Sequence, residues 1–590
     1  SMIGYAKQEL TIETSINNLE IFMVEQVIFG EEIVVSASRI QETVLESSVS
    51  VEKMDIRDVT SVAAPNFYDA IANIKGIDMN THSLLFKLPN SRGFNGETNL
   101  RFTQMIDGVD NAPPGLNFAA GNIMGIPQMD VESVELIMGA SSALYGPGGM
   151  SGTMLITSKS PFEYPGLSAS VQTGMLNVNS PESNPTPMVD ANLRFAKAFN
   201  DKFAIKLVAG YLQATDWIGT DYTNRNDPGN PDINHYTNPD YDGVNVYGDD
   251  VVVPVNLSDY AIDIATGAAE QFNYTPGTPA YDSVVNNIVA RIPDQLVTRT
   301  GYKEAEVHDH QTYNLRTRLA LNYRFNANLE LEAQGGYTRG SSIYTAQTRY
   351  VLQNFAALTG KLELKSEDFF LRAWTVQEDA GKTFDLGGSV TQLNEAWKSS
   401  EDWYADFVEA FTTSHIISGQ DLERAYVISR SAADNRSPDG NVYNPSDPVV
   451  RPLPGSAEFD AIWQPIIGKT RDQGGGLVKD FSSVYHFEGL YDFSKFFKKM
   501  NLQVGASHRI YSVSSDGTLF FDKPGEPIIQ HQFGAFGQIM QPFFNDRLKV
   551  TLSGRYDKNQ YFDGQFTPRL SLVLSLDRAK QHNIRASTQT

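Results

Sequence analysis

The most extensive pattern in this 590-residue chain is a series of segments in which apolar and polar residues alternate. From about residue 165 onward, such segments of roughly 10–16 residues are separated by turns. The alternation is clearest in Arg547–Tyr556, where leucine and valine fall on one face and lysine, threonine and serine on the other. Alternation with period two predicts strands, about 13 in all. They are expected near residues 166–176, 189–200, 202–217, 310–326, 329–344, 349–364, 368–379, 480–494, 501–517, 528–544, 547–562, 566–577 and 582–590.

The turns between these strands alternate between short and long. Residues 218–309 and 380–479 form very long connections rich in Asp, Asn, Pro, Gly and Tyr. Connections of that length are rarely structureless, and we expect helices within residues 401–431. The first connection is rich in carboxylates, which are oxygen ligands of the kind Ca²⁺ prefers, although the EF-hand spacing is absent. The weak Ca²⁺ candidates are Asp227, Asp232, Asp240 and Asp242, and a solvated acidic loop is the alternative interpretation.

Hydropathy restricts how the chain can meet a membrane. No run approaches 18 apolar residues, so the sequence predicts no membrane-spanning helix. A transmembrane β-barrel stays compatible with this, because its lipid-facing residues alternate with polar ones. The 26 Tyr and 33 Phe suit the aromatic girdles of such a barrel, and equally a soluble β-sandwich.

Charge and residue usage exclude several function classes. A net charge of −23 argues against nucleic acid as a partner, because little positive charge is available for phosphates. The absence of cysteine excludes disulfides, thiol catalysis and thiolate metal sites. The nine histidines show no His-Glu-x-x-His spacing, and neither a Gly-x-Ser-x-Gly elbow nor a dinucleotide fingerprint is present. We therefore predict that the protein is not an enzyme and has no resident cofactor.

Residues 40–160 read differently, as a compact mixed α/β domain. Residues 67–74 show helical spacing of apolar residues and are followed by Gly76, which suits a helix end. Residues 131–160 hold two strand-like pieces around a turn rich in glycine, serine and proline, Gly146–Gly149. The turn lacks the Gly-Lys-Ser/Thr ending of a phosphate-binding loop, so a hairpin turn is the simple interpretation.

The order of residues in the stretch 131–160 is more specific than its composition. It resembles the end of the plug domain of TonB-dependent outer-membrane receptors. The matching residues are Val131-Glu132, Gly139, Ser142–Gly146, Gly148 and Gly152. Arg92-Gly93-Phe94 and Ile106–Val109 resemble two further plug motifs in the right order. Met138, where the family usually has arginine, and Ser91, where it has an apolar residue, are departures. The plug-motif residues that the resemblance singles out are Arg92, Gly93, Asp107, Gly108, Gly139, Tyr145, Gly146 and Gly152.

The resemblance implies the fold class and the division of the chain. The expected fold is mainly β, a transmembrane antiparallel β-barrel of 22 strands enclosing a mixed α/β plug. Because about 13 strands are predicted and no signal peptide precedes them, we expect a longer receptor with further residues at both ends. The expected domains are 1–29, the end of a carboxypeptidase-regulatory-like β-sandwich of the Bacteroidetes type; 30–39, a TonB box; 40–162, the plug; and 163–590, the incomplete barrel.

A short segment ahead of the plug resembles the TonB box. Two glutamates precede a β-branched triplet, which favours an extended conformation suited to strand addition with a partner. The predicted coupling residues are Ile33, Val34, Val35, Ser36 and Ala37. An ordinary strand of the plug or of the preceding sandwich is the alternative.

The resemblance implies a protein of the bacterial cell outer membrane, in contact with its lipids. It implies TonB-dependent active uptake of a scarce solute (metal chelate, glycan or peptide), powered through TonB with ExbB and ExbD. A surface lipoprotein is a further implied partner, and Phe94, Asn117 and Phe118 are candidate solute contacts. The alternative is a non-transporting, receptor-like barrel that serves as a binding or assembly subunit of a larger complex. A secreted glycan-binding protein or glycosidase suits the composition and leaves the plug motifs unexplained.

Overall fold

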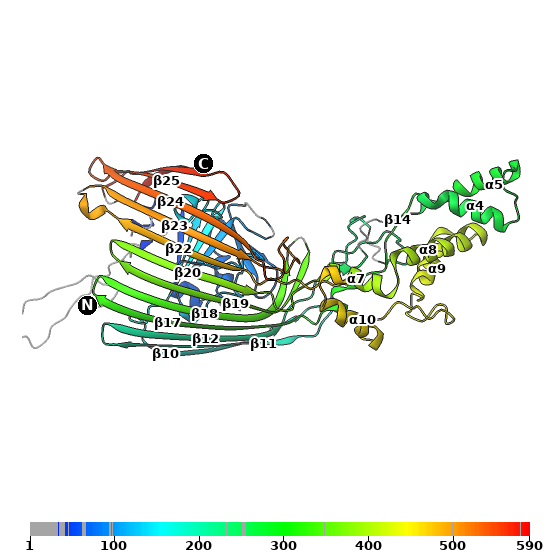
Figure 1. The fold of residues 1–590 in the computed structure, drawn as a ribbon, viewed down its shortest axis with the longest axis horizontal. Helices are drawn as coiled ribbons and strands as arrows, with labels where there is room; N and C mark the ends of the chain where they lie inside the picture. Colours follow the sequence, from blue (N-terminus) through cyan, green and yellow to red (C-terminus); the bar gives the residue numbers. More distant parts are fainter. Residues whose placement is uncertain are drawn as a thin grey trace, which may run out of the picture.

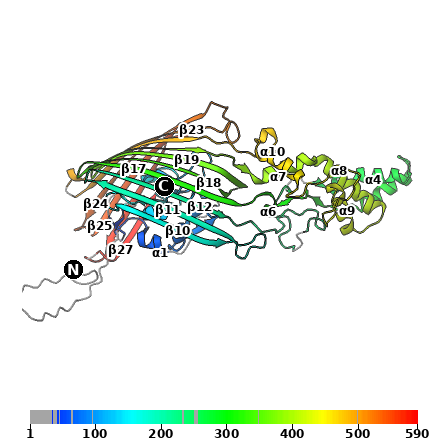
Figure 2. The same ribbon diagram turned by 90° about the horizontal axis from the view of Figure 1, so that it is seen from below.

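The computed structural model describes residues 33–34, 42–44, 46–61, 66–93, 96, 98–230, 234–249, 255–346, 348–497, 499–578 and 580–589. A large curved sheet, here called the wall, surrounds a small domain near the amino-terminal end of the chain, the plug (Figure 1). Helices from two long connections project beyond one end of the wall and form a lobe (Figures 1 and 2). The three parts are thus nested or stacked along the longest axis of the molecule.

The wall is an antiparallel sheet of 14 strands. All but one of them follow each other in chain order, with β10 and β27 at the edges, and β21 (Phe384–Asp385) pairs separately with β19. The strands lie close to the predicted positions, which confirms the fold class. They are β10 (Gly166–Leu176), β11 (Thr186–Phe199), β12 (Phe203–Thr215), β17 (Gln311–Asn326), β18 (Leu329–Thr345), β19 (Arg349–Ser366), β20 (Phe369–Asp379), β22 (Ser483–Asp492), β23 (Asn501–Val513), β24 (Ile528–Phe543), β25 (Leu548–Asn559), β26 (Gln565–Ser575) and β27 (Asn583–Gln589).

The two faces of the wall are reversed relative to a water-soluble sheet. In β25, Leu552 points outward and is 54% exposed, whereas Thr551 and Ser553 point toward the plug and are 4% and 2% exposed. The alternation predicted for this strand is therefore present, with the apolar residues outside. A polar inner face and an apolar outer face are typical of a sheet that is surrounded by hydrocarbon.

The plug is built on a five-stranded sheet in the order β3-β8-β9-β6-β7. β6 and β9 are parallel, and the other neighbours are antiparallel. Its elements are β3 (Val51–Asp55), α1 (Ile56–Ser61), α2 (Tyr68–Ile71), β4 (Ile77–Thr81), β5 (Lys87–Ser91), β6 (Phe102–Ile106), β7 (Val109–Asp110), η1 (Gln128–Asp130), β8 (Val131–Met138), α3 (Ser142–Tyr145) and β9 (Gly152–Ser158).

One predicted plug element is shorter than expected. The apolar spacing predicted a helix over residues 67–74, but α2 covers only Tyr68–Ile71. Turns follow it and lead to Gly76, whose φ of 76° begins the hairpin of β4 and β5. Tyr68 and Ile71 are fully buried under the plug sheet, so this single turn of helix is the part that packs against the sheet.

The lobe contains most of the helices. The predicted helices within 401–431 are present as α8 (Ser400–Phe411), η3 (Thr412–Ile417) and α9 (Leu422–Asp434). The further elements are β13 (Val246–Tyr247), β14 (Val255–Asn256), η2 (Leu257–Tyr260), α4 (Ala261–Gln271), α5 (Pro279–Val289), β15 (Leu296–Val297), β16 (Tyr302–Lys303), α6 (Glu304–Val307), α7 (Leu386–Trp397), α10 (Ala457–Ile467) and η4 (Arg471–Gln473). Among the described residues, none of the helices has both the length and the apolar character needed to cross a membrane.

Both long connections contribute to one core in the lobe. Leu257 and Ile264 of the first connection pack with Trp403, Phe407 and other residues of the second. Polar contacts join the same two segments: the Arg430 guanidinium donates to Thr300 Oγ1 over 3.1 Å. The lobe therefore folds as one unit from segments that lie more than a hundred positions apart.

Candidate functional site: the contacts between plug and wall

The inner contact between plug and wall centres on Asp107, in the turn between β6 and β7. Arg318 of β17 donates to Asp107 Oδ2 over 2.9 Å, and Gln334 of β18 donates to the same oxygen over 3.2 Å. Within the plug, Ser158 donates its backbone N–H to Asp107 Oδ1 over 2.8 Å. The turn of the Ile106–Val109 motif is thus held by the plug and by two wall strands together.

Charge and close packing both define this turn. Burial raises the pKa of Asp107, but the positive charges of Lys361, Arg318 and Lys206 outweigh burial and hold it well below its usual value. The neighbouring Gly108 has φ of 78°, and a Cβ there would lie 2.1 Å from Arg372 Nη1. Only glycine permits both that conformation and that approach.

A cavity of about 530 Å³ lies beside this turn, between the plug sheet and the wall. Ion pairs cross its wall side: Lys361 pairs with Glu332 over 3.1 Å, and Arg372 pairs with Glu363. The plug side contributes Asp107, Glu132 and Tyr145. A polar cavity of this size suits water and small hydrophilic solutes.

A second inner contact is a buried ion cluster. Asp130 of η1 accepts from Arg194 Nε of β11 over 2.8 Å and pairs with Lys206 Nζ of β12 over 3.0 Å. All three side chains are at most 3% exposed. Lys206 also donates to Ser158 Oγ and to the Lys159 carbonyl, over 2.8 and 2.9 Å. This cluster fixes the end of β9 to the wall.

The glycine-rich motif around Tyr145 packs against two partners. A Cβ at Gly152 would lie 2.4 Å from the Phe102 ring, so β9 and β6 approach more closely than a larger residue would allow. Gly146, with φ of 86°, ends α3, and a Cβ there would lie 3.3 Å from Arg555 of the wall.

Gly139, with φ of 91°, faces the Arg92 side chain, and a Cβ there would lie 3.0 Å from Arg92 Nη1. Arg92 and Gly93 form an exposed turn, with φ of 57° and 72°.

The predicted coupling segment begins in a docked strand. β1 (Ile33–Val34) pairs antiparallel with β2 (Glu42–Thr43). Val34 is fully buried and packs with Val51 and Ile137 of the plug, while Tyr145 borders this cluster. Val35, Ser36 and Ala37 lie outside the described residues, as does the predicted sandwich remnant 1–29.

The predicted solute contacts are separated by the structure. Asn117 is exposed, with φ of 47°. Phe118 is 4% exposed and packs edge-on against Phe86, with ring centroids 5.4 Å apart, and also against Tyr344 of β18. The role of Phe118 as a solute contact stays a prediction, and in this structure the loop folds its aromatic ring inward against the wall. Phe94 lies outside the described residues.

Two buried carboxylates hold the loop that contains Asn117. Glu378 Oε1 of β20 accepts from the backbone N–H groups of Gly115 and Leu116. Glu378 and Asp480 are 5% and 0% exposed, and the backbone N–H of Ser482 donates to Asp480 Oδ1 over 2.8 Å.

This pair leads to a prediction about pH. Burial raises the pKa of Asp480 to about 6, above its ordinary value of 3.8. Because the folded state then binds the proton more tightly than the unfolded state, this stabilisation is complete below about pH 4 and is lost as pH rises to about 6. The loss amounts to about 3 kcal/mol, at roughly 1.4 kcal/mol for each pKa unit.

The measurement is the free energy of unfolding of the purified protein between pH 4 and 7.5. We expect Asp480→Asn to remove the part of the pH dependence between pH 4 and 6 that Asp480 contributes, because an amide does not titrate. Asp439→Asn, at an exposed position of the lobe, is the matched control and should keep the wild-type profile. A wild-type profile unchanged by Asp480→Asn would contradict the prediction.

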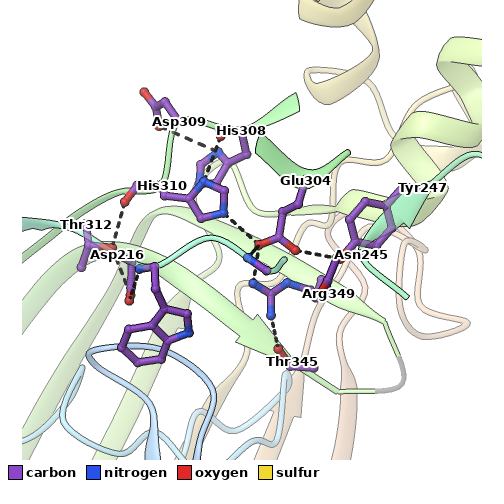
Figure 3. A network of polar contacts seen from close by, with 12 residues as sticks. Asp216, Asn245, Tyr247, Glu304, His308, Asp309, His310, Thr312, Thr345 and Arg349 are labelled. Atoms are coloured by element: carbon purple, nitrogen blue, oxygen red, sulfur yellow. Dashed lines mark hydrogen bonds and ion pairs between the residues drawn. The ribbon is translucent and has the colours of Figure 1, made fainter. Parts of the chain in front are cut away.

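At the end of the wall that carries the lobe, the plug meets the base of the lobe (Figure 3). The backbone N–H of Leu84, at the tip of the β4–β5 hairpin, donates to Asp216 over 2.9 Å. Asp216 directly follows β12, and its own N–H donates to the His310 carbonyl over 2.9 Å. Ser83 and Ser342 of β18 share a second hydrogen bond of 3.0 Å. The hairpin tip is thus fixed to the rim of the wall.

Glu304 continues this network into the lobe (Figure 3). Its fully buried carboxylate accepts from Arg349 over 2.6 Å, from Tyr247 over 2.9 Å, and contacts His310 Nε2 at 2.9 Å. Burial raises the pKa of Glu304, but the His310 hydrogen bond and the Arg349 charge outweigh it and lower it to about 2. Burial also lowers the pKa of His308 to about 4, so this ring is neutral at pH 7.

Sequence reasoning did not find this network. Its members come from the ends of β12 and β17, from α6 and from the start of β19, and no spacing connects them. The closeness of His308 and His310 in the sequence was the available signal. Their side chains are 8% and 0% exposed, and only the folded chain brings the Glu304 carboxylate to His310.

The weak Ca²⁺ candidates are not assembled into a site in the described part of the chain. Within it, no group of three or more His, Cys, Asp or Glu side chains is arranged to hold a metal ion. Asp242 instead pairs with Arg225 over 3.1 Å. Asp227 is exposed, Asp240 is half-buried, and Asp232 lies outside the described residues.

Comparisons with known proteins agree with this architecture. Residues 43–153 match the family model of the TonB-dependent Receptor Plug Domain. A mutant form of the ferric enterobactin receptor of Pseudomonas aeruginosa is similar in structure, with a TM-score of 0.50 and 12% identity over 95% of this chain and 63% of that chain. The siderophore receptor PirA of Acinetobacter baumannii has a TM-score of 0.49 at 10% identity, covering 92% and 61% of the two chains. The copper transporter OprC has a TM-score of 0.46 at 11% identity, covering 92% and 64%. No curated protein sequence matches.

These findings define a class of fold. The chain has the fold of TonB-dependent receptors, with a plug domain inside a large antiparallel sheet. It spans 63% of the length of the ferric enterobactin receptor to which it is similar.

Proposed function

We propose that the protein carries out TonB-dependent active uptake of a scarce solute, a metal chelate, glycan or peptide, across the bacterial outer membrane. The single observation that carries this proposal is a plug domain enclosed by a wall whose outer face is apolar and whose inner face is polar. A hydrocarbon environment favours the apolar outer face, because polar side chains that face lipid are costly. A plug inside such a wall closes a path, and its removal or rearrangement opens one.

The ends of the wall strands support the membrane location. Exposed aromatic side chains gather at the turns of the end that lies away from the lobe, where amphipathic rings favour the membrane–water interface. They include Phe199, Phe203, Tyr323, Phe325, Phe496 and Phe544. With this orientation the long connections lie outside the cell, and the short turns and the start of the plug face the periplasm.

The docked strand β1 supports coupling to TonB. Among the described residues, Ile33 and Val34 pair with Thr43 and Glu42 of β2, and Val34 packs on the plug. Strand addition to a partner would replace this pairing with hydrogen bonds to the partner strand. TonB with ExbB and ExbD is the partner system we propose, and a surface lipoprotein over the lobe is a further one.

The charge of the lobe favours some solutes over others. Residues 218–309 and 380–479 contain 29 Asp and Glu against 13 Lys and Arg, a large share of the net charge of −23. Such a field slows the approach of polyanions and attracts cations. The solute that we propose is therefore neutral or positively charged when it meets the lobe.

Transport of this kind involves no covalent chemistry, in line with the receptor and transporter folds to which the chain is similar. One observation favours the alternative of a non-transporting assembly subunit. Buried ion pairs clamp the plug to the wall at Asp107 and at Asp130, which opposes movement of the plug. In that case the lobe would serve as the binding surface.

A growth experiment with coupling variants separates these functions. The gene would be replaced by a version encoding Val34→Pro, which removes a backbone donor from β1, or by a deletion. Growth is compared under iron limitation and on single polysaccharides, with abundance of the wild-type protein measured in parallel. Glu52→Gln, at an exposed plug position, is the control.

Uptake predicts that Val34→Pro reproduces the growth defect of the deletion while the protein is still made. Induction by iron limitation would identify a metal chelate, and induction by one polysaccharide would identify a glycan. A deletion defect that Val34→Pro does not share would contradict TonB-dependent uptake and favour the assembly role.

A further inference from the structure

The outward face of the wall carries a hollow of about 850 Å³ over strands β18 to β25. Its floor is a row of small residues: Gly489 pairs with Ala506, and Ala506 with Ala535, across β22, β23 and β24. Leu371 and Tyr556 continue the same row on β20 and β25 and are 57% and 49% exposed. Small side chains between bulky ones produce the depression.

Basic side chains border this hollow on its side toward the lobe. The next row of the sheet contains His508, Phe533 and Lys558, which pair in register. His508 Nε2 lies 3.1 Å from His531 Nδ1, and the His508 ring stacks on Phe533 with centroids 4.3 Å apart. Lys558 donates one N–H to the Phe562 carbonyl over 2.7 Å, which leaves two for another acceptor.

These basic groups stand out from their surroundings. The outward positions around them are apolar, such as Val504, Ile539 and Leu552, each at least 40% exposed. Two imidazoles and an ammonium beside hydrocarbon are costly unless an anion accompanies them. An apolar hollow next to a basic rim therefore matches a ligand that is apolar at one end and anionic at the other.

We propose that this hollow binds an outer-leaflet lipid, with an acyl chain over Gly489, Ala506 and Ala535 and a phosphorylated headgroup held by His508, His531 and Lys558. The orientation of this site rests on the proposed function, which places the lobe outside the cell. The hollow is continuous with the apolar outer face of the wall, so an acyl chain enters it directly from the membrane. The Lys558 ammonium binds phosphate through charge-assisted hydrogen bonds, and the imidazole N–H groups add further donors.

The test is native mass spectrometry of the intact, delipidated chain in detergent, titrated with lipid A. The same lipid with its phosphates removed is the ligand control. One variant, His508→Gln with His531→Gln and Lys558→Gln, removes the basic groups and keeps the hollow. A second, Ala506→Leu with Ala535→Leu, fills the hollow and keeps the basic groups. Lys197→Gln, at another outward lysine of the wall, is the matched control.

We expect one tightly bound lipid A, bound about tenfold more weakly by the triple variant and unchanged by Lys197→Gln. The variant with the filled hollow should bind both lipids more weakly. The triple variant should bind only the phosphorylated lipid more weakly. Equal binding of both lipids by the wild type would overturn the proposal, as would displacement of lipid A by millimolar inorganic phosphate or a dimer that forms in place of the lipid complex. Because the readout is lipid mass, it does not depend on whether uptake occurs.

Discussion

Replacing Asp130 with alanine is expected to destabilise the seating of the plug by about 3–5 kcal/mol. The substitution leaves Arg194 and Lys206 buried at 3% and 2% exposure without the carboxylate between them. Removing one partner of a buried ion pair costs more than the pair contributes, because the remaining charge has lost both water and counterion. The plug end of β9, which Lys206 also holds, should then open at lower denaturant concentration.

Because the chain contains no cysteine, one introduced cysteine is a unique labelling site for following plug unfolding. Lys75→Cys, in an exposed turn of the plug, provides one labelling site for a fluorophore whose signal follows plug unfolding in urea. Asp78→Ala, at an exposed position of the same domain, should change stability by less than about 0.5 kcal/mol. Equal unfolding midpoints for the Asp130 and Asp78 variants would show that the buried cluster does not hold the plug.

Trp403→Ala is expected to unfold the lobe while the wall and plug remain folded. Trp403 is fully buried, and its Nε1 donates to Asp434 over 2.8 Å. Its ring also faces the guanidinium groups of Arg299 and Arg430 at 5.7 and 5.5 Å. Truncating a buried tryptophan costs about 3–5 kcal/mol, and here both guanidinium groups also lose their aromatic neighbour. Because the lobe core is built by both long connections, both should loosen together.

Limited proteolysis of the purified protein tests this. Trypsin should cut the Trp403 variant at lysines and arginines within residues 218–309 and 380–479, and leave the wall strands intact. Tyr443→Ala, at a lobe residue that is 46% exposed, should keep the wild-type pattern. Cleavage confined to one connection would mean that the two do not share a cooperative core.

The hydrogen bonds between the base of the lobe and the rim of the wall also connect the lobe to the plug. Asp216 binds the plug hairpin at Leu84, and the adjoining strand carries His310 to Glu304 at the base of the lobe (Figure 3). Loosening of the lobe should therefore reach the plug hairpin through these hydrogen bonds. The hairpin tip is the part of the plug that contacts this network, through Asp216.

Much of the fold could be predicted from local pattern. Alternation with period two located the wall strands, because each wall residue faces either the outside or the inside of the sheet. The motif around Tyr145 could be recognised because Gly146 and Gly152 are constrained by a left-handed turn and by contact with Phe102. Helices within 401–431 were expected because so long a connection is rarely structureless, whereas α4, α5, α7 and α10 were not. Glycines lie within α4 and α7, α5 begins at a proline, and α10 contains Pro465.

The sequence by itself determined the class of fold, the order of plug and wall, and the absence of cysteine chemistry from this chain. These follow from periodicities and residue types that each short segment carries. The tertiary structure alone decided that Phe118 points inward, that Glu304 joins lobe to wall, and that Asp130 lies between Arg194 and Lys206. It also decided that Ala506 and Ala535 form the floor of a hollow beside His508. Each depends on the register of strands far apart in the chain, and strand register is set by the packing of the whole sheet around the plug.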